Sequence, residues 1–269
     1  MLKTRIITAL VLVTVFIPAL FMLSATYWAY GMLALSLLAL NEWAEMIQLS
    51  TKQRIAYLIV ATVAGFFIVQ QLDQKGFHWF FFQSLNVFLL VAIFWTLIVP
   101  LWLVKKWVVN KYTLALLGLL LMASIWLGLI CAKGADPTLL LALLATIWIA
   151  DSAAYFAGKN FGKHKLAPGI SPGKTWEGVW GALIAVTIFG IILYFAYNIN
   201  SLAIFPAVWL IAGLGVIGDL FESLMKRQAD VKDSGFLLPG HGGILDRIDG
   251  IIPSLPIAIL MIYAYNLWW

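Results

Sequence analysis

Long apolar runs alternate with short polar segments along the whole chain. A helix needs about 20 largely apolar residues to cross the hydrocarbon core of a bilayer. We predict nine transmembrane helices, at approximately 6–24, 27–47, 55–70, 80–103, 113–132, 138–156, 176–197, 203–225 and 251–268. The second run is interrupted by polar residues near Asn41 and Glu42, and the third run is short.

The composition supports this interpretation and excludes other classes of protein. Of the 269 residues, 63% are hydrophobic and 11% are charged, and the mean hydropathy is +0.98. A water-soluble domain has roughly a quarter charged residues, and disordered chains are poor in apolar residues. A transmembrane β-barrel would alternate apolar and polar residues instead of grouping them in unbroken runs. We therefore predict an all-α polytopic integral membrane protein.

The basic residues predict the orientation of the chain in the membrane. With nine spans and a cytoplasmic N-terminus, all 17 lysines and arginines except Lys75 and Lys133 fall on the cytoplasmic side. Cytoplasmic loops are enriched in lysine and arginine, which supports this orientation. With nine spans and a cytoplasmic N-terminus, we expect the C-terminus to lie outside. The net charge of +5 then reflects topology, and no nucleic-acid partner is expected. The single cysteine, Cys131, excludes an internal disulfide and a cysteine-based zinc site within one chain.

Acidic residues divide the chain into two parts. Residues 1–135 hold few acids, and we predict that they form an N-terminal region of spans one to five. Residues 136–269 hold most of the acids, and we predict a catalytic transmembrane region of spans six to nine. Its cytoplasmic loops are expected at 157–175 and 226–250.

Five acids are predicted to collect at the inner face of the membrane: Asp151, Asp219, Glu222, Asp246 and Asp249. A carboxylate in hydrocarbon costs about 3 kcal/mol or more, so it needs water, a cation or a basic partner. Asp219 and Glu222 are three residues apart and share one helix face, and Asp246 and Asp249 repeat that spacing. The acids either pair with neighbouring basic residues or bind a hard cation such as magnesium, which takes oxygen ligands.

The loop after the eighth span combines positive charge with glycine. Lys226, Arg227 and Lys232 offer charge for phosphate groups. Gly240, Gly242 and Gly243 surround His241 and permit close backbone approach and unusual dihedral angles. His241 is either a structural histidine or a site residue.

The loop after the sixth span resembles a P-loop only in part. Gly173, Lys174 and Thr175 supply the end of that motif, but Pro168 stands where its first glycine is required, so we exclude a Walker site. Together with Ser171, these residues precede a predicted helix, whose N-terminus can hold phosphate oxygens. The alternative is a basic loop that faces lipid headgroups.

The segment from Ser223 to Asp249 resembles the signature of the phosphatidate cytidylyltransferase family. The resemblance covers the constrained positions Ser223, Met225, Lys226, Arg227, Lys232, Asp233, Gly235, Leu238, Pro239, His241, Gly242, Gly243, Ile244, Asp246, Arg247, Ile248 and Asp249. The upstream residues Asp151, Ser171, Pro172, Lys174, Thr175 and Glu177 look like a second conserved loop of that family. The resemblance is specific over about 151–250 and only general over the first 135 residues.

This resemblance implies an enzyme that makes CDP-diacylglycerol from CTP and phosphatidate and releases pyrophosphate. It also implies a multi-pass protein of the bacterial inner membrane that requires magnesium, with potassium as a second metal and a homodimer as the assembly. By the same resemblance, Asp219 and Asp246 are expected to bind metal. Asp249 and Glu222 are physical assignments, as further ligands of that metal or as residues that support its ligands.

The remaining roles are physical assignments onto matching positions. We expect catalytic contributions from the two metal carboxylates and from Lys226, Arg227, Lys232 and His241. Substrate binding is assigned to Ser171, Lys174, Thr175, Ser223, Asp233 and Arg247. A membrane transporter with a cytoplasm-facing ion site is the alternative function. Transporters hold polar sites at the bilayer midplane in repeated, broken helices, whereas these acids collect at one face and no internal repeat is evident.

Overall fold

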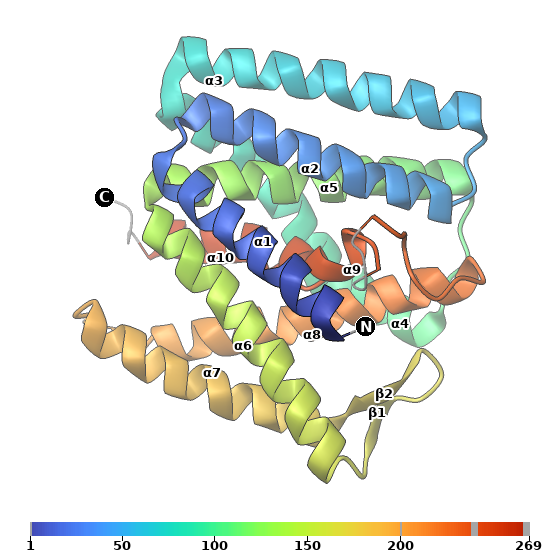
Figure 1. Ribbon diagram of the computed structural model, residues 1–269, viewed down its shortest axis with the longest axis vertical. Coiled ribbons are helices and arrows are strands. Elements are labelled where there is room, and N and C mark those ends of the chain that lie inside the picture. The colour runs from blue at the N-terminus through green and yellow to red at the C-terminus, as the bar shows by residue number, and fades with distance from the viewer. Residues whose placement is uncertain (1, 200, 238–241, 266–269) are drawn as a thin grey trace.

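The computed structural model describes residues 2–199, 201–237 and 242–265, with residues 2–9 and 12 described by their backbone alone. Nearly all of this part of the chain is helical (Figure 1). The elements in chain order are α1 (Leu2–Met22), α2 (Ala25–Met46), α3 (Thr51–Ile93), the π-helical η1 (Phe94–Ile98), α4 (Val99–Lys105), α5 (Lys111–Ala135), α6 (Pro137–Phe161), β1 (Lys165–Ala167), β2 (Ser171–Thr175), α7 (Trp176–Ala196), α8 (Ile204–Gln228), α9 (Leu245–Ile248) and α10 (Ile251–Ala264).

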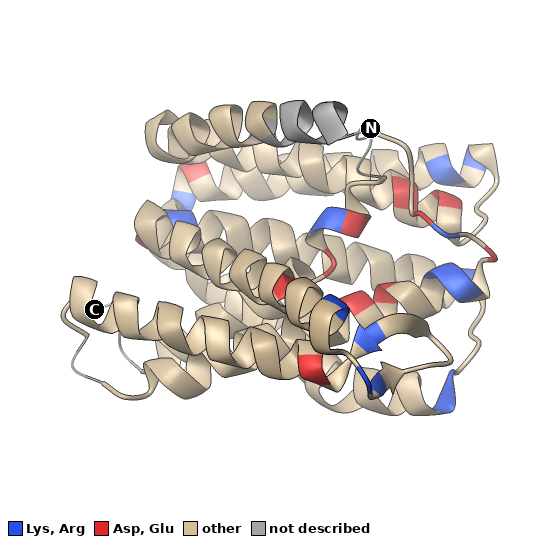
Figure 2. Ribbon diagram, turned by 60° about the horizontal axis from the view of Figure 1, so that its bottom comes forward, with Lys and Arg blue, Asp and Glu red and all other residues tan. Residues whose placement is uncertain are grey.

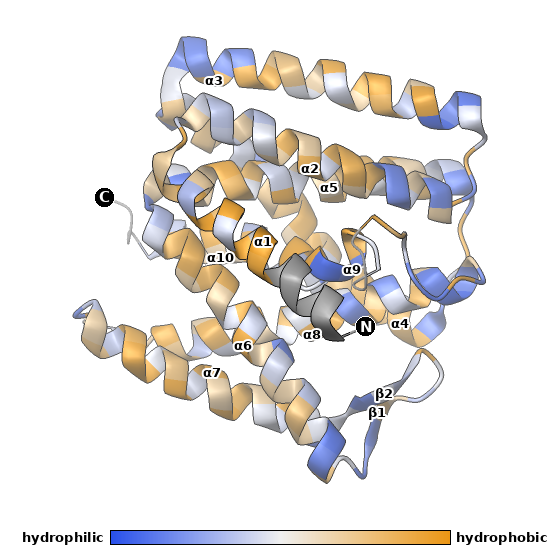
Figure 3. Cartoon of the chain, in the orientation of Figure 1, coloured by the Kyte–Doolittle hydropathy of each residue, from blue (hydrophilic) through white to orange (hydrophobic). Residues whose placement is uncertain are grey.

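Helices long and apolar enough to cross a membrane make up most of the described chain. There are six such segments within it: Thr51–Lys105, Lys111–Ala135, Pro137–Phe161, Trp176–Ala196, Ile204–Gln228 and Leu245–Ala264. Figure 3 shows apolar residues along the helices and hydrophilic residues mainly at their ends. The chain is therefore a multi-pass α-helical membrane protein, as its apolar runs predict.

The longest of these segments contains a sharp break at Gly76. This residue has φ 80° and ψ 171°, a backbone conformation that glycine adopts without steric cost. Figure 1 shows the chain turning at one end of α3 and running back toward α4. Two predicted spans, 55–70 and 80–103, lie on either side of this turn. The total of nine spans remains a prediction.

Short polar residues define where several helices begin. Ser50 and Gln53 form a reciprocal capping box at the start of α3. Asn110 accepts hydrogen bonds from two backbone N–H groups at the start of α5. Asp136 caps α6, where Pro137 occupies a first-turn position that needs no N–H. These caps satisfy backbone donors that a helix leaves unpaired at its N-terminus.

The helices pack in two groups around α8 and α10. In Figure 1, α2, α3 and α5 lie along one edge, while α6 and α7 form the opposite edge. Two indole groups join α2 to α5: Trp126 Nε1 donates to Ala29 O at 2.9 Å, and Trp43 Nε1 donates to Leu114 O at 2.8 Å. These bonds satisfy buried N–H groups between helices, where no water is available.

The segment predicted as a cytoplasmic loop at 157–175 is mostly ordered secondary structure and includes a short hairpin, within a chain that is otherwise helical over its described residues. Helix α6 continues to Phe161, and β1 and β2 then form an antiparallel hairpin in which Lys165 pairs with Thr175. The short strands escaped prediction because the glycines and prolines of this segment are typical of loops. The hairpin brings β2 against α6, α7 and α8.

The second apolar run forms one helix, in line with the predicted span 27–47, although polar residues interrupt the run. Helix α2 is continuous across Asn41 and Glu42. The Glu42 side chain is buried and faces hydrogen-bond donors from the other end of the chain, which removes the need for the helix to break.

Candidate active site

Charged side chains from α6, β2, α8 and α9 converge at one end of the helical bundle. Figure 2 shows many of the charged segments at that end, while the lengths of most helices are free of charge. Lys174 of β2 forms an ion pair with Asp219 of α8, whose other oxygen accepts a hydrogen bond of 3.2 Å from Ser223 Oγ. The hairpin therefore positions a predicted phosphate-binding lysine beside a predicted metal carboxylate.

Lys226 connects two further acids of the predicted site. Its Nζ lies 2.9 Å from Glu222 Oε2 and 2.6 Å from Asp246 Oδ1. Lys226 follows Glu222 by one helical turn, which places both side chains on the same face of α8. The three side chains are largely buried, with exposed fractions of 14% for Lys226, 7% for Glu222 and 8% for Asp246. Charges this poorly hydrated persist because they neutralise one another.

The backbone of the loop before α9 holds Asp246. Its Oδ2 accepts hydrogen bonds from Gly243 N at 2.8 Å and from Ser234 N at 3.1 Å. Gly242 has φ 81°, and a Cβ atom at this position would stand 2.8 Å from Asp246 Oδ2. The unusual dihedral expected in this glycine-rich loop is thus found at Gly242, where it lets the backbone wrap around the carboxylate.

The other predicted acids lie in the same electrostatic environment. Asp249 accepts a hydrogen bond of 2.8 Å from Gly250 N and interacts electrostatically with Asp219, Glu222 and Asp151. Asp151 is exposed on α6 and interacts with Lys174, Asp219 and Arg247. The five acids are therefore linked electrostatically, although they come from separate parts of the sequence.

The remaining predicted residues occupy different environments. The exposed side chains, open to a soluble ligand, are those of Arg227, Lys232, Asp233 and Arg247. Ser171 begins β2 and is partly buried. Thr175 is buried, and its hydroxyl accepts a hydrogen bond from Gly178 N as the N-cap of α7. His241 and its neighbour Gly240 lie outside the described residues.

The oxygen donors of this cluster are of the type that magnesium prefers. Glu222 Oε1 is buried and accepts no hydrogen bond from the described residues, so it retains lone pairs for a cation. Among the described residues, no three acidic, histidine or cysteine side chains lie close enough together to hold a metal ion. Lys174 and Lys226 neutralise the carboxylates instead. The residues fit magnesium in chemical type, with side chains that must rearrange to hold it.

Two polar residues near the site were not assigned a function from the sequence. Glu42 of α2 accepts hydrogen bonds from the loop that carries Asp246. The signal available in the sequence was an acid within an apolar run. His164 lies 2.7 Å from Glu177 through Nδ1 and Oε1, and its backbone N–H also donates to that carboxylate. This pair joins the hairpin to the first turn of α7.

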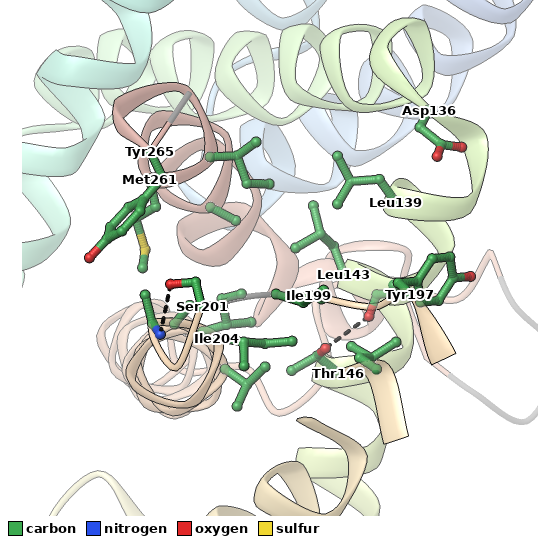
Figure 4. Close-up of a pocket in the computed structure, with 18 of the residues that line it drawn as sticks. Asp136, Leu139, Leu143, Thr146, Tyr197, Ile199, Ser201, Ile204, Met261 and Tyr265 are labelled. Carbon is green, nitrogen blue, oxygen red and sulfur yellow. Dashed lines mark hydrogen bonds between the residues drawn. The ribbon is translucent and has the colours of Figure 1, made fainter. Parts of the chain in front are cut away.

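A separate cavity of about 310 Å³ lies between α6, α7, α8 and α10. Its lining is mostly aliphatic, and Figure 4 shows Leu139, Leu143, Ile204 and Met261 around it. These residues come from the ends of α6, α8 and α10 opposite to the acids. None of the predicted site residues lines this cavity, so the charged cluster and the cavity are distinct.

Comparisons with known proteins cover nearly the whole chain. The model of the Cytidylyltransferase family matches residues 3–265. The phosphatidate cytidylyltransferase of Pseudomonas aeruginosa is 38% identical over 275 residues, covering 98% of each chain. The enzyme of that name from Haemophilus influenzae is 35% identical, covering 95% of this chain and 96% of its own. The one from Thermotoga maritima is 31% identical, covering 97% and 96%.

The match extends well beyond the segment 151–250 that carries the sequence signature, and it includes the helices of the N-terminal half. The clustered acids and lysines are thus set in a chain that is similar to these proteins from end to end. The chain belongs to the cytidylyltransferase family.

Proposed function

We propose that this protein is a phosphatidate cytidylyltransferase, which transfers CMP from CTP to phosphatidate and forms CDP-diacylglycerol and pyrophosphate. The observation that carries the proposal is the convergence of Lys174, Asp219, Lys226 and Asp246 at one end of an apolar helical bundle. A site at such an end can meet a soluble nucleotide and a lipid headgroup together. The names of the similar proteins support the same reaction.

The proposed reaction needs little covalent chemistry from the protein. An ionised phosphate oxygen of phosphatidate attacks the α-phosphorus of CTP, and a new oxygen–phosphorus bond forms. The bond from the α-phosphorus to the bridging oxygen of the β-phosphate breaks, and pyrophosphate leaves with that electron pair. Because both reactants are anions, positioning and charge neutralisation dominate catalysis.

The basic residues supply fixed positive charge for that step. Lys174 and Lys226 already stand beside carboxylates within the cluster and are proposed to contact phosphate oxygens. The exposed Arg227, Lys232 and Arg247 are placed where they can attract either substrate. Further substrate binding is proposed for Ser171, Thr175, Ser223 and Asp233. His241 is proposed to donate a hydrogen bond to the pyrophosphate.

The carboxylates are proposed to hold magnesium, with Asp219 and Asp246 as ligands and Asp249 and Glu222 as further ones. When bound, the ion would neutralise phosphate charge and align the two substrates. A second, monovalent cation such as potassium belongs to the same proposal. The Glu222 Oε1 lone pairs and the oxygen-rich cluster support it.

We further propose nine membrane spans, a cytoplasmic N-terminus, an outer C-terminus, a location in the bacterial inner membrane and a homodimeric assembly. The lysines of the hairpin and of the end of α8 favour a cytoplasmic position for the site. This orientation gives the site access to CTP, which is made in the cytosol.

The decisive experiment is an assay of the purified protein in micelles that contain phosphatidate, with CTP and magnesium. We expect CDP-diacylglycerol and pyrophosphate in equal amounts, loss of both with EDTA, and recovery on adding magnesium. If the folded, unsubstituted protein forms no CDP-diacylglycerol, the proposal is rejected. A transporter, the alternative function, would release no pyrophosphate.

A further inference from the structure

Glu42 lies near the C-terminal end of α2 and is almost fully buried, with an exposed fraction of 2%. Burial of an unpaired carboxylate is costly, so its partners reveal its role. All the partners identified come from one segment about 200 residues later in the chain. Glu42 therefore joins α2 to the segment that leads into α9.

Three donors of this segment surround the carboxylate. Ile244 N donates to Oε1 at 3.0 Å, Leu245 N donates to Oε2 at 2.9 Å, and Ser234 Oγ donates to Oε2 at 3.3 Å. Hydrogen bonds to an ionised acceptor are stronger than those between neutral groups. The arrangement can therefore fix the path of the backbone before α9.

The segment fits around Glu42 without room for additional atoms. A Cβ atom at Gly243 would stand 2.5 Å from Glu42 Oε2, and one at Gly235 would stand 2.6 Å from Oε1. Both distances are shorter than van der Waals contact permits. Two glycines of the loop thus allow the close approach that the carboxylate needs.

Residues that surround Glu42 also donate hydrogen bonds to Asp246. The Ser234 hydroxyl donates to Glu42, while the Ser234 N–H donates to Asp246 Oδ2 at 3.1 Å. Gly243, which packs against Glu42, donates its N–H to the same Asp246 oxygen at 2.8 Å. Glu42 also binds the N–H of Leu245, the residue directly before Asp246. No described contact joins Glu42 to the Lys226 ammonium, so its effect on the charged cluster passes through this loop.

We propose that Glu42 is a positioning residue that holds Ser234 and residues 243–245 in the conformation in which Asp246 faces Lys226 and Glu222. The inference rests on the proposed cytidylyl transfer and gives α2 a part in building the site. It explains why a buried acid stands in α2.

The test compares Glu42→Gln with wild-type protein in the micellar assay, with Glu45→Gln as the matched control. Glu45 lies on the same helix, but its side chain is 65% exposed and pairs with Arg54. Glutamine keeps the size of the side chain but places an NH₂ group against backbone donors. Because a displacement of about 1 Å can cost about 100-fold in rate, we expect kcat per folded molecule to fall roughly 100-fold. We expect KM for CTP to change less than threefold. We expect kcat per folded molecule of Glu42→Asp to be at least tenfold higher than that of Glu42→Gln.

Thermal unfolding and the amount of folded protein are measured for every variant. If Glu42→Gln keeps its kcat, or if it loses only folded protein while kcat per folded molecule is unchanged, Glu42 is merely structural and the inference is wrong. If Glu42→Gln does not fold, Ser234→Ala decides, because it removes one donor to Glu42 and leaves the N–H to Asp246. We then expect a severalfold fall in kcat, and an unchanged value overturns the inference. Wild-type protein that forms no CDP-diacylglycerol rejects the proposed function, whereas active wild-type with an unimpaired variant rejects this inference alone.

Discussion

The Lys226 ammonium lies 2.6 Å from Asp246 Oδ1 and so joins the end of α8 to the start of α9. The two residues are 20 positions apart, and the loop between them returns the chain to the same point. Both side chains are largely buried, with exposed fractions of 14% for Lys226 and 8% for Asp246. Its removal should affect both the fold and the reaction.

Replacing Lys226 by methionine leaves Glu222 and Asp246 buried without their shared cation. Breaking a buried ion pair costs about 3–5 kcal/mol, and we expect the free energy of unfolding of Lys226→Met to fall by that order. We also expect turnover to be abolished. Unfolding in detergent and the micellar assay measure the two effects, with the exposed Lys105→Met as a control expected to behave as wild type. Stability equal to wild type would contradict the structural role of Lys226.

A second substitution separates stability from catalysis. Without Lys226, the carboxylates of Glu222 and Asp246 are both left without their cation. The double variant Glu222→Gln/Lys226→Met removes one of these two charges, so we expect its free energy of unfolding to be higher than that of Lys226→Met. Activity should remain absent, because the positive charge near the substrates is still missing. Recovery of activity without Lys226 would show that its role is structural alone.

Asp246 is the second residue of this pair, and its carboxylate also accepts two backbone N–H groups. We expect Asp246→Asn to abolish formation of CDP-diacylglycerol, because the variant loses the negative charge proposed to hold magnesium. Asp230→Asn is the control. Asp230 is exposed with φ 56°, a conformation that asparagine adopts readily, so no loss is expected. Near-normal turnover by Asp246→Asn would reject the metal role.

The class of the fold could be predicted from the sequence because apolar run length is a direct consequence of bilayer thickness. The convergence of Glu222 and Asp246 followed from helix periodicity and the expected topology, and the structure places both carboxylates against the Lys226 ammonium. The pairing of Lys174 with Asp219 could not be foreseen in the same way. It depends on the hairpin, whose strands are too short to leave a pattern.

Glu42 shows a different limit of sequence reasoning. An acid in an apolar run indicates a partner, but the run itself does not say which segment supplies it. The donors are the Ser234 hydroxyl and two backbone N–H groups, and backbone groups leave no signal in side-chain patterns. The apolar run therefore predicted the helix at 27–47 but not the buried contact that Glu42 makes from it.

Gly242 offers a test of the loop geometry that does not change any charge. Its φ of 81° is a conformation that residues with a side chain rarely adopt. A Cβ atom at this position would also stand only 2.8 Å from Asp246 Oδ2. We expect Gly242→Ala to reduce turnover by about 10- to 100-fold through displacement of Asp246. Gly31→Ala is the control, because Gly31 lies in α2 with open space around its Cβ position. Full activity of Gly242→Ala in the micellar assay would mean that this conformation is not needed.

The proposed topology can be tested with single cysteines, because Cys131 is fully buried and should react slowly. Lys75 and Lys163 are both exposed, and Lys75 directly precedes the turn at Gly76. If that turn separates two spans and the N-terminus is cytoplasmic, Lys75 lies outside and Lys163 inside. We therefore expect an impermeant maleimide to label Lys75→Cys in intact cells and Lys163→Cys only after permeabilisation. The unsubstituted protein gives the background from Cys131. The nine-span model places three spans between the two positions, at 80–103, 113–132 and 138–156, so the two cysteines must lie on opposite sides of the membrane. Labelling of both variants from the same side would contradict that model.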